Sequence, residues 1–331
     1  MTLVLSQGSA LNGTGTWTNL HDDELRRRAV TAARDRDEAT LISLTRTYLT
    51  LNSASGVRTS KNTLDAYTRG VRRYLTYTGE QAVNLLHPGR HDPSRYVQFL
   101  QAEGLTPAGV RLRVSAASCL YRALRWAGAT DADPFRDVRL PRDTTSGIEK
   151  RPPYTEEDLV EVLHHADLHE TFLLFLVAHA GLRIAEALNL RWEDIDETRR
   201  VLIVRSGKGG KMRRVAMSVR LARAARHFRA LYEPGGPEHS RYRPRGREPE
   251  FVFRYGTRQT AYTHLEAAFQ RAGVEFRGFH PGRKYAGTRL IAQIKDFGRV
   301  AAHLGHESVD TTRKGYAQLP ADDLKGEVAG W

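Results

Sequence analysis

A tyrosine close to the carboxyl end of the sequence, Tyr316, follows a cluster of basic side chains. His280 and Arg283 form a His-x-x-Arg pair, and His306 stands between this pair and the tyrosine. A phenol is a poor nucleophile at neutral pH, because its pKa is about 10. It becomes useful where cations fix an electrophile beside it and stabilise the charge that develops. A phosphodiester is the natural electrophile for this set of residues.

A further cation, Arg183, lies inside an apolar stretch between Leu182 and Ile184. The apolar pattern over residues 172–190 predicts two helices that meet near Gly181. A local salt bridge to Glu186, one turn further on, would account for the arginine. The alternative is an arginine that is held rigidly so that its planar fork binds phosphate oxygens.

Two short segments, residues 201–205 and 213–217, predict strands joined by a glycine-rich turn. The turn places Lys208 at its tip, with Lys211 on the same loop. Residues 205–229 contain nine Lys or Arg and no acidic residue, and a solvated face would normally mix charges of both signs. Within this segment, arginines recur at helical spacing at positions 220, 223, 226 and 229. The segment therefore indicates binding to a phosphate backbone.

The whole chain is also basic, with a formal net charge of +13 over 331 residues, which favours a polyanionic partner such as nucleic acid. Cys119 is the only cysteine, so the sequence has no intrachain disulfide and no cysteine-built zinc site. The longest apolar run, residues 171–182, is too short to span a bilayer. No Lys or Arg precedes Arg26, so we expect no signal peptide and a cytoplasmic, nucleoid-associated protein.

The elements that must position these residues divide into two domains. We expect a mobile leader over residues 1–21, a helical domain over 22–138, a linker over 139–153, a second domain over 154–320 and a tail over 321–331. In the helical domain, Ser60 and Thr106 are candidate helix caps, and Thr155 opens the second domain with a near capping box. We further expect strand 251–253 and helix 258–272. The predicted fold is mainly α with a small β-sheet.

Basic side chains on the predicted outer faces of both domains are candidate DNA contacts, although any single one could belong to a solvated face. They are Lys61, Arg69, Arg72, Arg73, Arg111, Lys211, Arg213, Arg214 and Arg220.

Five motifs occur together in one order: residues 180–190 around Arg183, Gly207-Lys208-Gly209, residues 280–283, Leu304-Gly305-His306, and Tyr316. This ordered set resembles the tyrosine recombinase/integrase family, and most closely its Xer-like and phage-integrase members. The resemblance covers residues 150–320 strongly and residues 37–140 weakly. It implies an N-terminal SAM-like core-binding domain followed by an α+β catalytic domain.

The resemblance also implies a reaction, in which a DNA strand is cut and rejoined through a 3′-phosphotyrosine. Tyr316 would attack the phosphate, and Arg183 and Arg283 would hold its non-bridging oxygens. Lys208, or Lys211 on the same loop, would protonate the leaving 5′ oxygen. The other roles would fall to His280 as proton acceptor or phosphate donor, to His306 as a further donor, and to Glu186 as a brace for Arg183. No cofactor, metal ion or ATP is implied.

The implied assembly is a homotetramer on two double-stranded DNA sites, with or without a second recombinase, and with no membrane partner. The sequence departs from the family pattern at Pro281, Gly282 and Lys284, and three residues separate Thr312 from Tyr316. These departures leave the subgroup open. Two alternatives remain: an inactive DNA-binding protein on the same fold, and a type IB topoisomerase. The tail, which ends in Trp331, is a candidate contact between subunits.

Overall fold

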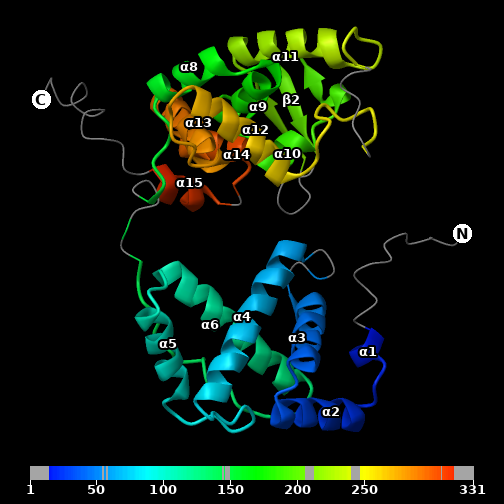
Figure 1. The fold of residues 1–331 in the computed structure, drawn as a ribbon, viewed down its shortest axis with the longest axis vertical. Helices are drawn as coiled ribbons and strands as arrows, with labels where there is room; N and C mark the ends of the chain where they lie inside the picture. Colours follow the sequence, from blue (N-terminus) through cyan, green and yellow to red (C-terminus); the bar gives the residue numbers. More distant parts are fainter. Residues whose placement is uncertain are drawn as a thin grey trace, which may run out of the picture. The chain divides into compact units, whose positions relative to one another are not determined.

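A computed structural model describes residues 15–53, 56, 59–143, 145, 150–205, 212–239, 247–306 and 308–316. The chain divides into two compact units, Met1–Thr144 and Thr145–Trp331 (Figure 1). The boundary between the units falls inside the predicted linker, residues 139–153. We describe each unit separately.

The first unit is entirely helical in its described residues. Its helices are α1 (Gly15–Thr18), α2 (Asp22–Asp35), α3 (Glu38–Asn52), α4 (Lys61–Glu80), α5 (Asp92–Ala102) and α6 (Pro107–Trp126). The predicted caps are present, because the side chain of Ser60 accepts from the Thr63 amide and that of Thr106 from the Gly109 amide. Such caps satisfy backbone donors that a helix leaves unpaired at its start.

An aromatic cluster forms the centre of this unit. Tyr74, Tyr96 and Tyr121 are each at most 1% exposed, and all three rings contact Phe135. Helices α4 and α6 approach closely at Gly70, where an added Cβ would lie 2.4 Å from the Ala116 Cβ. A larger residue at position 70 would therefore push the two helices apart.

The last part of the predicted leader, from residue 15 onward, is folded against the helical unit. Helix α1 lies within it, and Trp17 is 1% exposed and packs in the core of the unit. Its indole nitrogen donates to the Ser43 hydroxyl at 3.0 Å. A large apolar ring buried in this way stabilises the ordered state, so these residues belong to the folded unit. Residues 1–14 of the predicted leader lie outside the described part of the chain.

The second unit places a small sheet among helices. Its elements are α8 (Glu156–His165), α9 (Leu168–Ala178), α10 (Ile184–Leu188), η2 (Trp192–Asp194), β1 (Ile195–Asp196), β2 (Val201–Val204), β3 (Arg213–Ala216), α11 (Val219–Tyr232), α12 (Arg258–Arg271), α13 (Phe279–Ile294), α14 (Phe297–Leu304) and α15 (Val309–Tyr316). Helix α9 is buried along most of its length and lies among α11, α12 and α13 (Figure 1). Its apolar character, noted in the sequence, is that of a central core helix.

The sheet is antiparallel with the order β1-β2-β3, and Leu202 of β2 faces Ile195 on one side and Val215 on the other. The predicted strand over residues 251–253 is wrong, because only one bridge, between Arg191 and Phe251, forms there. Val252 and Phe253 are both at most 1% exposed. They fill the core as consecutive residues, whereas strand residues alternate between two faces.

Among the helices of the described residues, we find none that has both the length and the apolar character needed to cross a membrane. The same residues contain no cluster of three or more side chains arranged to hold a metal ion.

Candidate active site

Three arginines from separate segments meet at the carboxyl end of α14. Their guanidiniums donate to three consecutive backbone carbonyls: Arg213 to His303 at 3.0 Å, Arg283 to Leu304 at 2.7 Å, and Arg183 to Gly305 at 2.9 Å. The last carbonyls of a helix have no partner within the helix and carry partial negative charge. The cations therefore satisfy them and fix the turn that leads into His306.

Glu186 is the carboxylate that these arginines share. Its oxygens accept two hydrogen bonds from Arg213, at 2.9 and 2.7 Å, and one from Nη1 of Arg183 at 2.9 Å. Nη1 of Arg283 lies 3.9 Å from Oε2 of the same residue. Burial alone would raise the pKa of Glu186, but the bonds from Arg213 and Arg183 outweigh it and lower that pKa. The predicted salt bridge between Arg183 and Glu186 is thus one part of a larger network.

The network carries a surplus of positive charge, because three guanidiniums surround one carboxylate. The side chains differ in exposure: Arg283 is 5% exposed, Arg213 is 12% and Arg183 is 34%. Arg183 is therefore the member that reaches solvent most, while the other two are fixed from within. Such a group is suited to bind an anion whose charge increases during a reaction.

Two glycines allow these segments to come so close. Gly181, in the turn between α9 and α10, has a φ of +67°, and its carbonyl accepts from Arg283 at 2.5 Å. A Cβ at Gly181 would lie 2.5 Å from the Leu304 side chain. Gly305 ends α14 with a φ of +69°, and a Cβ there would meet the guanidinium of Arg213 at 2.8 Å. Both positions need glycine for conformation and for space.

Two predicted histidines complete the described part of the cluster. His306 is half-buried, and burial together with Arg283 and Arg183 lowers its pKa to about 4. His280, in the first turn of α13, stays exposed, yet desolvation and the nearby cations Lys284 and Arg283 lower its pKa to about 4. Both imidazoles are therefore neutral at pH 7, as a proton acceptor or a neutral hydrogen-bond donor must be.

The position after Arg283, where the sequence departs from the family pattern, carries a buried lysine. Lys284 is 6% exposed, and its Nζ donates to the carbonyl of Arg151 at 2.7 Å. Burial, and then Arg151, lower its pKa. The bond joins α13 to the segment that opens the second unit.

The structure describes the predicted nucleophile and the predicted general acid less fully. The backbone of Tyr316 ends α15, and its side chain lies outside the described part of the structure. Lys208 and Lys211 also lie outside the described residues. Val204 pairs with Arg213 at the end of the hairpin, so both flanking strands end beside the arginine cluster.

Arg213 differs from its predicted role as a DNA contact, because its guanidinium points inward to Glu186. The alternation of side chains along a strand could have indicated that Arg213 faces inward. Arg213 lies on the same face of β3 as Val215, which is fully buried. The neighbouring Arg214 lies on the other face and is exposed. Arg213 is a site residue that the sequence interpretation assigned to the wrong surface.

The predicted arginine stripe on α11 is also incomplete. Arg229 donates to the carbonyls of Trp192 and Ile195, at 2.7 and 2.9 Å, and pairs with Glu197. Position 229 is nine positions after position 220, and a helix turns about 180° more than two full turns over that interval. Arg220 is therefore exposed while Arg229 faces inward. Figure 1 shows α11 and α15 on opposite sides of this unit.

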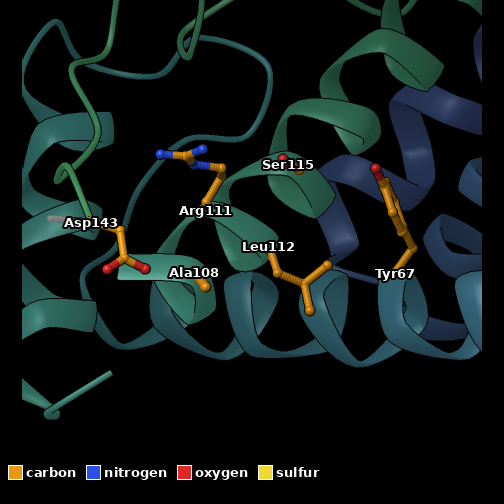
Figure 2. A pocket seen from close by; sticks show the side chains of 6 residues that line it. All are labelled: Tyr67, Ala108, Arg111, Leu112, Ser115 and Asp143. Carbon is orange, nitrogen blue, oxygen red and sulfur yellow. The ribbon is translucent and has the colours of Figure 1, made fainter. Parts of the chain in front are cut away.

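In the helical unit, the predicted DNA contacts fall into two groups. Lys61, Arg69 and Arg72 are all exposed on α4, and Arg72 also pairs with Glu38 at 2.7 Å, whereas Arg73 is partly buried and is bound to Glu103. Arg111 borders a hollow of about 320 Å³ between α4 and α6 (Figure 2). The hollow is lined by Tyr67, Ala108, Arg111, Leu112, Ser115 and Asp143.

Comparison with known proteins identifies the family of both units. The phage integrase family matches residues 154–322, and the phage integrase N-terminal SAM-like domain matches residues 51–128. Tyrosine recombinase XerD of Mycobacterium tuberculosis is 30% identical over 277 residues, which cover 76% of this chain and 86% of that protein. Tyrosine recombinase XerA of Thermococcus kodakarensis is 28% identical over 283 residues, covering 84% of this chain and 90% of that protein.

A solved structure shares the fold. It is the XerH site-specific recombinase bound to a palindromic difH substrate in a post-cleavage complex, at 16% identity with a TM-score of 0.61. The match covers 97% of this chain and 96% of that one. Together with the ordered site residues, these findings confirm the resemblance inferred from the sequence: the chain belongs to the phage integrase family of tyrosine recombinases.

Proposed function

We propose that this protein is a site-specific recombinase that cuts and rejoins double-stranded DNA through a covalent link to Tyr316. The observation that carries the proposal is the surplus-positive network of Arg183, Arg283 and Arg213 around Glu186. It lies at the end of α14, one short segment before the helix that ends in Tyr316.

The proposed first step forms one bond and breaks one. The phenolic oxygen of Tyr316 attacks phosphorus, its proton goes to His280, and the bond between phosphorus and the 5′ oxygen breaks. Lys208 or Lys211 supplies the proton to that leaving oxygen. One phosphodiester replaces another, so the reaction conserves a high-energy link and reverses when a 5′ hydroxyl attacks the phosphotyrosine.

The charged residues of the network have two different tasks in this scheme. Arg183 and Arg283 bind the non-bridging oxygens and stabilise the extra charge of the pentacoordinate transition state. Glu186 and Arg213 hold the two arginines in place, because a rigid donor needs no reorganisation when the charge appears. Neutral His306 donates a further hydrogen bond to the same oxygens.

We also propose that four copies act on two DNA sites. The proposal rests on the family, and the tail over residues 321–331 is its candidate contact between subunits. Sedimentation of the protein on one and on two binding sites tests it: a four-to-two ratio of protein to DNA supports the tetramer, and a one-to-one complex that turns over contradicts it.

The second candidate, an inactive DNA-binding protein, is not favoured. A protein that only binds DNA has no need for a buried carboxylate that aligns three guanidiniums next to two neutral histidines. A topoisomerase of type IB would use the same chemistry, but it would relax a supercoiled plasmid that lacks any recombination site.

The deciding experiment traps the covalent intermediate. Duplexes that bind the protein are selected from a random library, nicked to prevent rejoining, and incubated with the wild type. We expect a protein–DNA adduct whose peptide contains Tyr316, and no adduct with Tyr316→Phe, which still binds DNA. Tyr48→Phe, whose ring packs against Trp126 in the helical unit, is the matched control and should form the adduct. An adduct at another residue would contradict the assignment.

A further inference from the structure

We propose that Thr312 is a positioning residue that donates its hydroxyl hydrogen to Nδ1 of His306, and so fixes the tautomer in which Nε2 carries the hydrogen. The same bond sets His306 against the helix that carries Tyr316. The proposal deepens the proposed function and rests on it for its catalytic consequence.

The geometry is a direct contact between α15 and the end of α14. Oγ1 of Thr312 lies 2.7 Å from Nδ1 of His306. The backbone nitrogen of His306 donates to the carbonyl of Ala301 at 3.0 Å. His306 is thus held by α14 through its backbone and by α15 through its ring.

Thr312 is also the point at which α15 enters the core. It is fully buried, whereas the other residues of α15 with described side chains, Val309, Asp310, Thr311 and Arg313, are exposed. A buried hydroxyl without a hydrogen-bond partner destabilises the fold, because it loses its bonds to water and gains none in return. The ring of His306 supplies that partner.

The direction of the threonine hydroxyl is informative by comparison with other helices. Four helical threonines elsewhere in the structure donate to the carbonyl four residues back: Thr45 to Leu41, Thr50 to Arg46, Thr76 to Arg72, and Thr263 to Gln259. This local bond is common for threonine side chains in helices. The Thr312 hydroxyl instead lies within bonding distance of an imidazole from another segment.

The protonation state of His306 makes the direction of this bond matter. A neutral imidazole carries one hydrogen, on one nitrogen or the other. If Nδ1 accepts from Thr312, then Nε2 carries the hydrogen and can donate to a phosphate oxygen. If Nδ1 donates instead, Nε2 has only a lone pair, which a phosphate oxygen repels.

Two conservative substitutions separate this role from simple packing. Thr312→Val keeps the shape and removes the hydroxyl, and Thr312→Ser keeps the hydroxyl and removes a methyl group. Packing alone predicts that the valine variant is the better of the two, because burial of a methyl group is favourable. Tautomer control predicts that the serine variant is the better.

The first readout is adduct formation in a single turnover on the nicked duplex. Removing one donor to a developing negative charge costs about 10²–10³-fold, so we expect the valine variant to lose between about 10-fold and 100-fold in rate, since it keeps a fraction of the active tautomer. The serine variant should stay within about threefold of the wild type. DNA affinity and melting temperature are measured in parallel. A valine variant as fast as the wild type, or a serine variant slower than the valine variant, would overturn the proposal.

The second readout is the tautomer itself, from two-bond ¹⁵N–¹H correlations of the histidine side chains, with His306→Gln used to assign the signal. We expect the Nε2–H form in the wild type and a mixture in Thr312→Val. A wild type with hydrogen on Nδ1, or a valine variant with an unchanged tautomer, would refute it. If the wild type forms no adduct, the proposed function fails, and this readout still decides the role of Thr312.

Discussion

Glu186 binds the guanidinium of Arg213 through both carboxylate oxygens, at 2.9 and 2.7 Å, and thereby joins α10 to β3. The two residues are far apart in the sequence, and both are largely buried. Arg213 continues to the end of α14 through the His303 carbonyl. This ion pair therefore links three segments: the start of α10 with Arg183, strand β3 of the hairpin, and the end of α14 beside His306.

We expect Glu186→Gln to destabilise the second unit and to slow cleavage. Removing one partner of a buried ion pair typically costs about 3–5 kcal/mol, because the remaining charge stays buried and unpaired. Here three guanidiniums would face each other without a carboxylate. Urea unfolding measures the stability, and single-turnover adduct formation measures the rate.

The matched control is Glu193→Gln, which removes an exposed carboxylate that pairs with Arg205 at 3.1 Å. An exposed pair contributes about 0–1 kcal/mol, so this variant should resemble the wild type. Equal effects of the two substitutions would contradict a special role for Glu186.

Arg213 and Arg214 give a second comparison, because neighbouring strand residues face opposite sides. Arg213→Lys loses the planar fork that binds Glu186, so it should reduce stability and cleavage while DNA affinity changes little. Arg214→Ala should leave stability unchanged, weaken DNA binding, and reduce the slope of log affinity against log salt by about one. Binding titrations at several salt concentrations and thermal melts measure both. The reversed pattern would restore Arg213 as a DNA contact.

The sequence predicts much of the helix order, the caps and the turn at Gly181, because helical periodicity, caps and glycine positions are local signals. Thr155 forms the capping box expected of it, and Gly181 lies at the expected turn. The hydrogen-bond partners of Arg213 and Thr312 could not be predicted in this way. They depend on which segments meet in space. The spacing of residues along one strand or helix does not indicate which carbonyl or imidazole of another segment will lie beside it.

The same limit explains the segment around Phe253. Its aromatic and β-branched composition is typical of a strand, yet the ring packs against Phe172 and Phe228 in the core. Tertiary packing decides the outcome where local propensity is weak. Trp17 shows the opposite case, in which the local sequence predicts no ordered structure but tertiary packing creates it. The residues around Trp17 are polar and rich in glycine, yet its ring is buried.

Gly305 and Gly273 provide a further test, because their φ values are +69° and +68° but their surroundings differ. An alanine at Gly273 meets no atom within 4 Å, so Gly273→Ala should cost only the strain of a left-handed residue, about 1 kcal/mol. Gly305→Ala adds a contact of 2.8 Å with Arg213. We expect it to be clearly less stable and to lose adduct formation, as measured by urea unfolding and the nicked-duplex assay. Equal stability losses would show that Arg213 moves aside without consequence.

The pH dependence of stability should reveal the neutral histidines. The pKa of His306 falls from 6.5 to about 4 on folding, because of burial and of Arg283, Arg183, His280 and Arg213 around it. Between these values the unfolded chain binds more protons than the folded one, so the unfolding free energy decreases as the pH falls from about 6.5 to about 4. His306→Gln should make this decrease smaller in urea unfolding at several pH values.

His179→Gln should do the same, since burial also lowers the pKa of His179 to about 4, but it should leave adduct formation intact at pH 7.5. A stability that does not change with pH in the wild type would contradict the neutral state, and loss of cleavage in the His179 variant would remove the distinction between the two histidines.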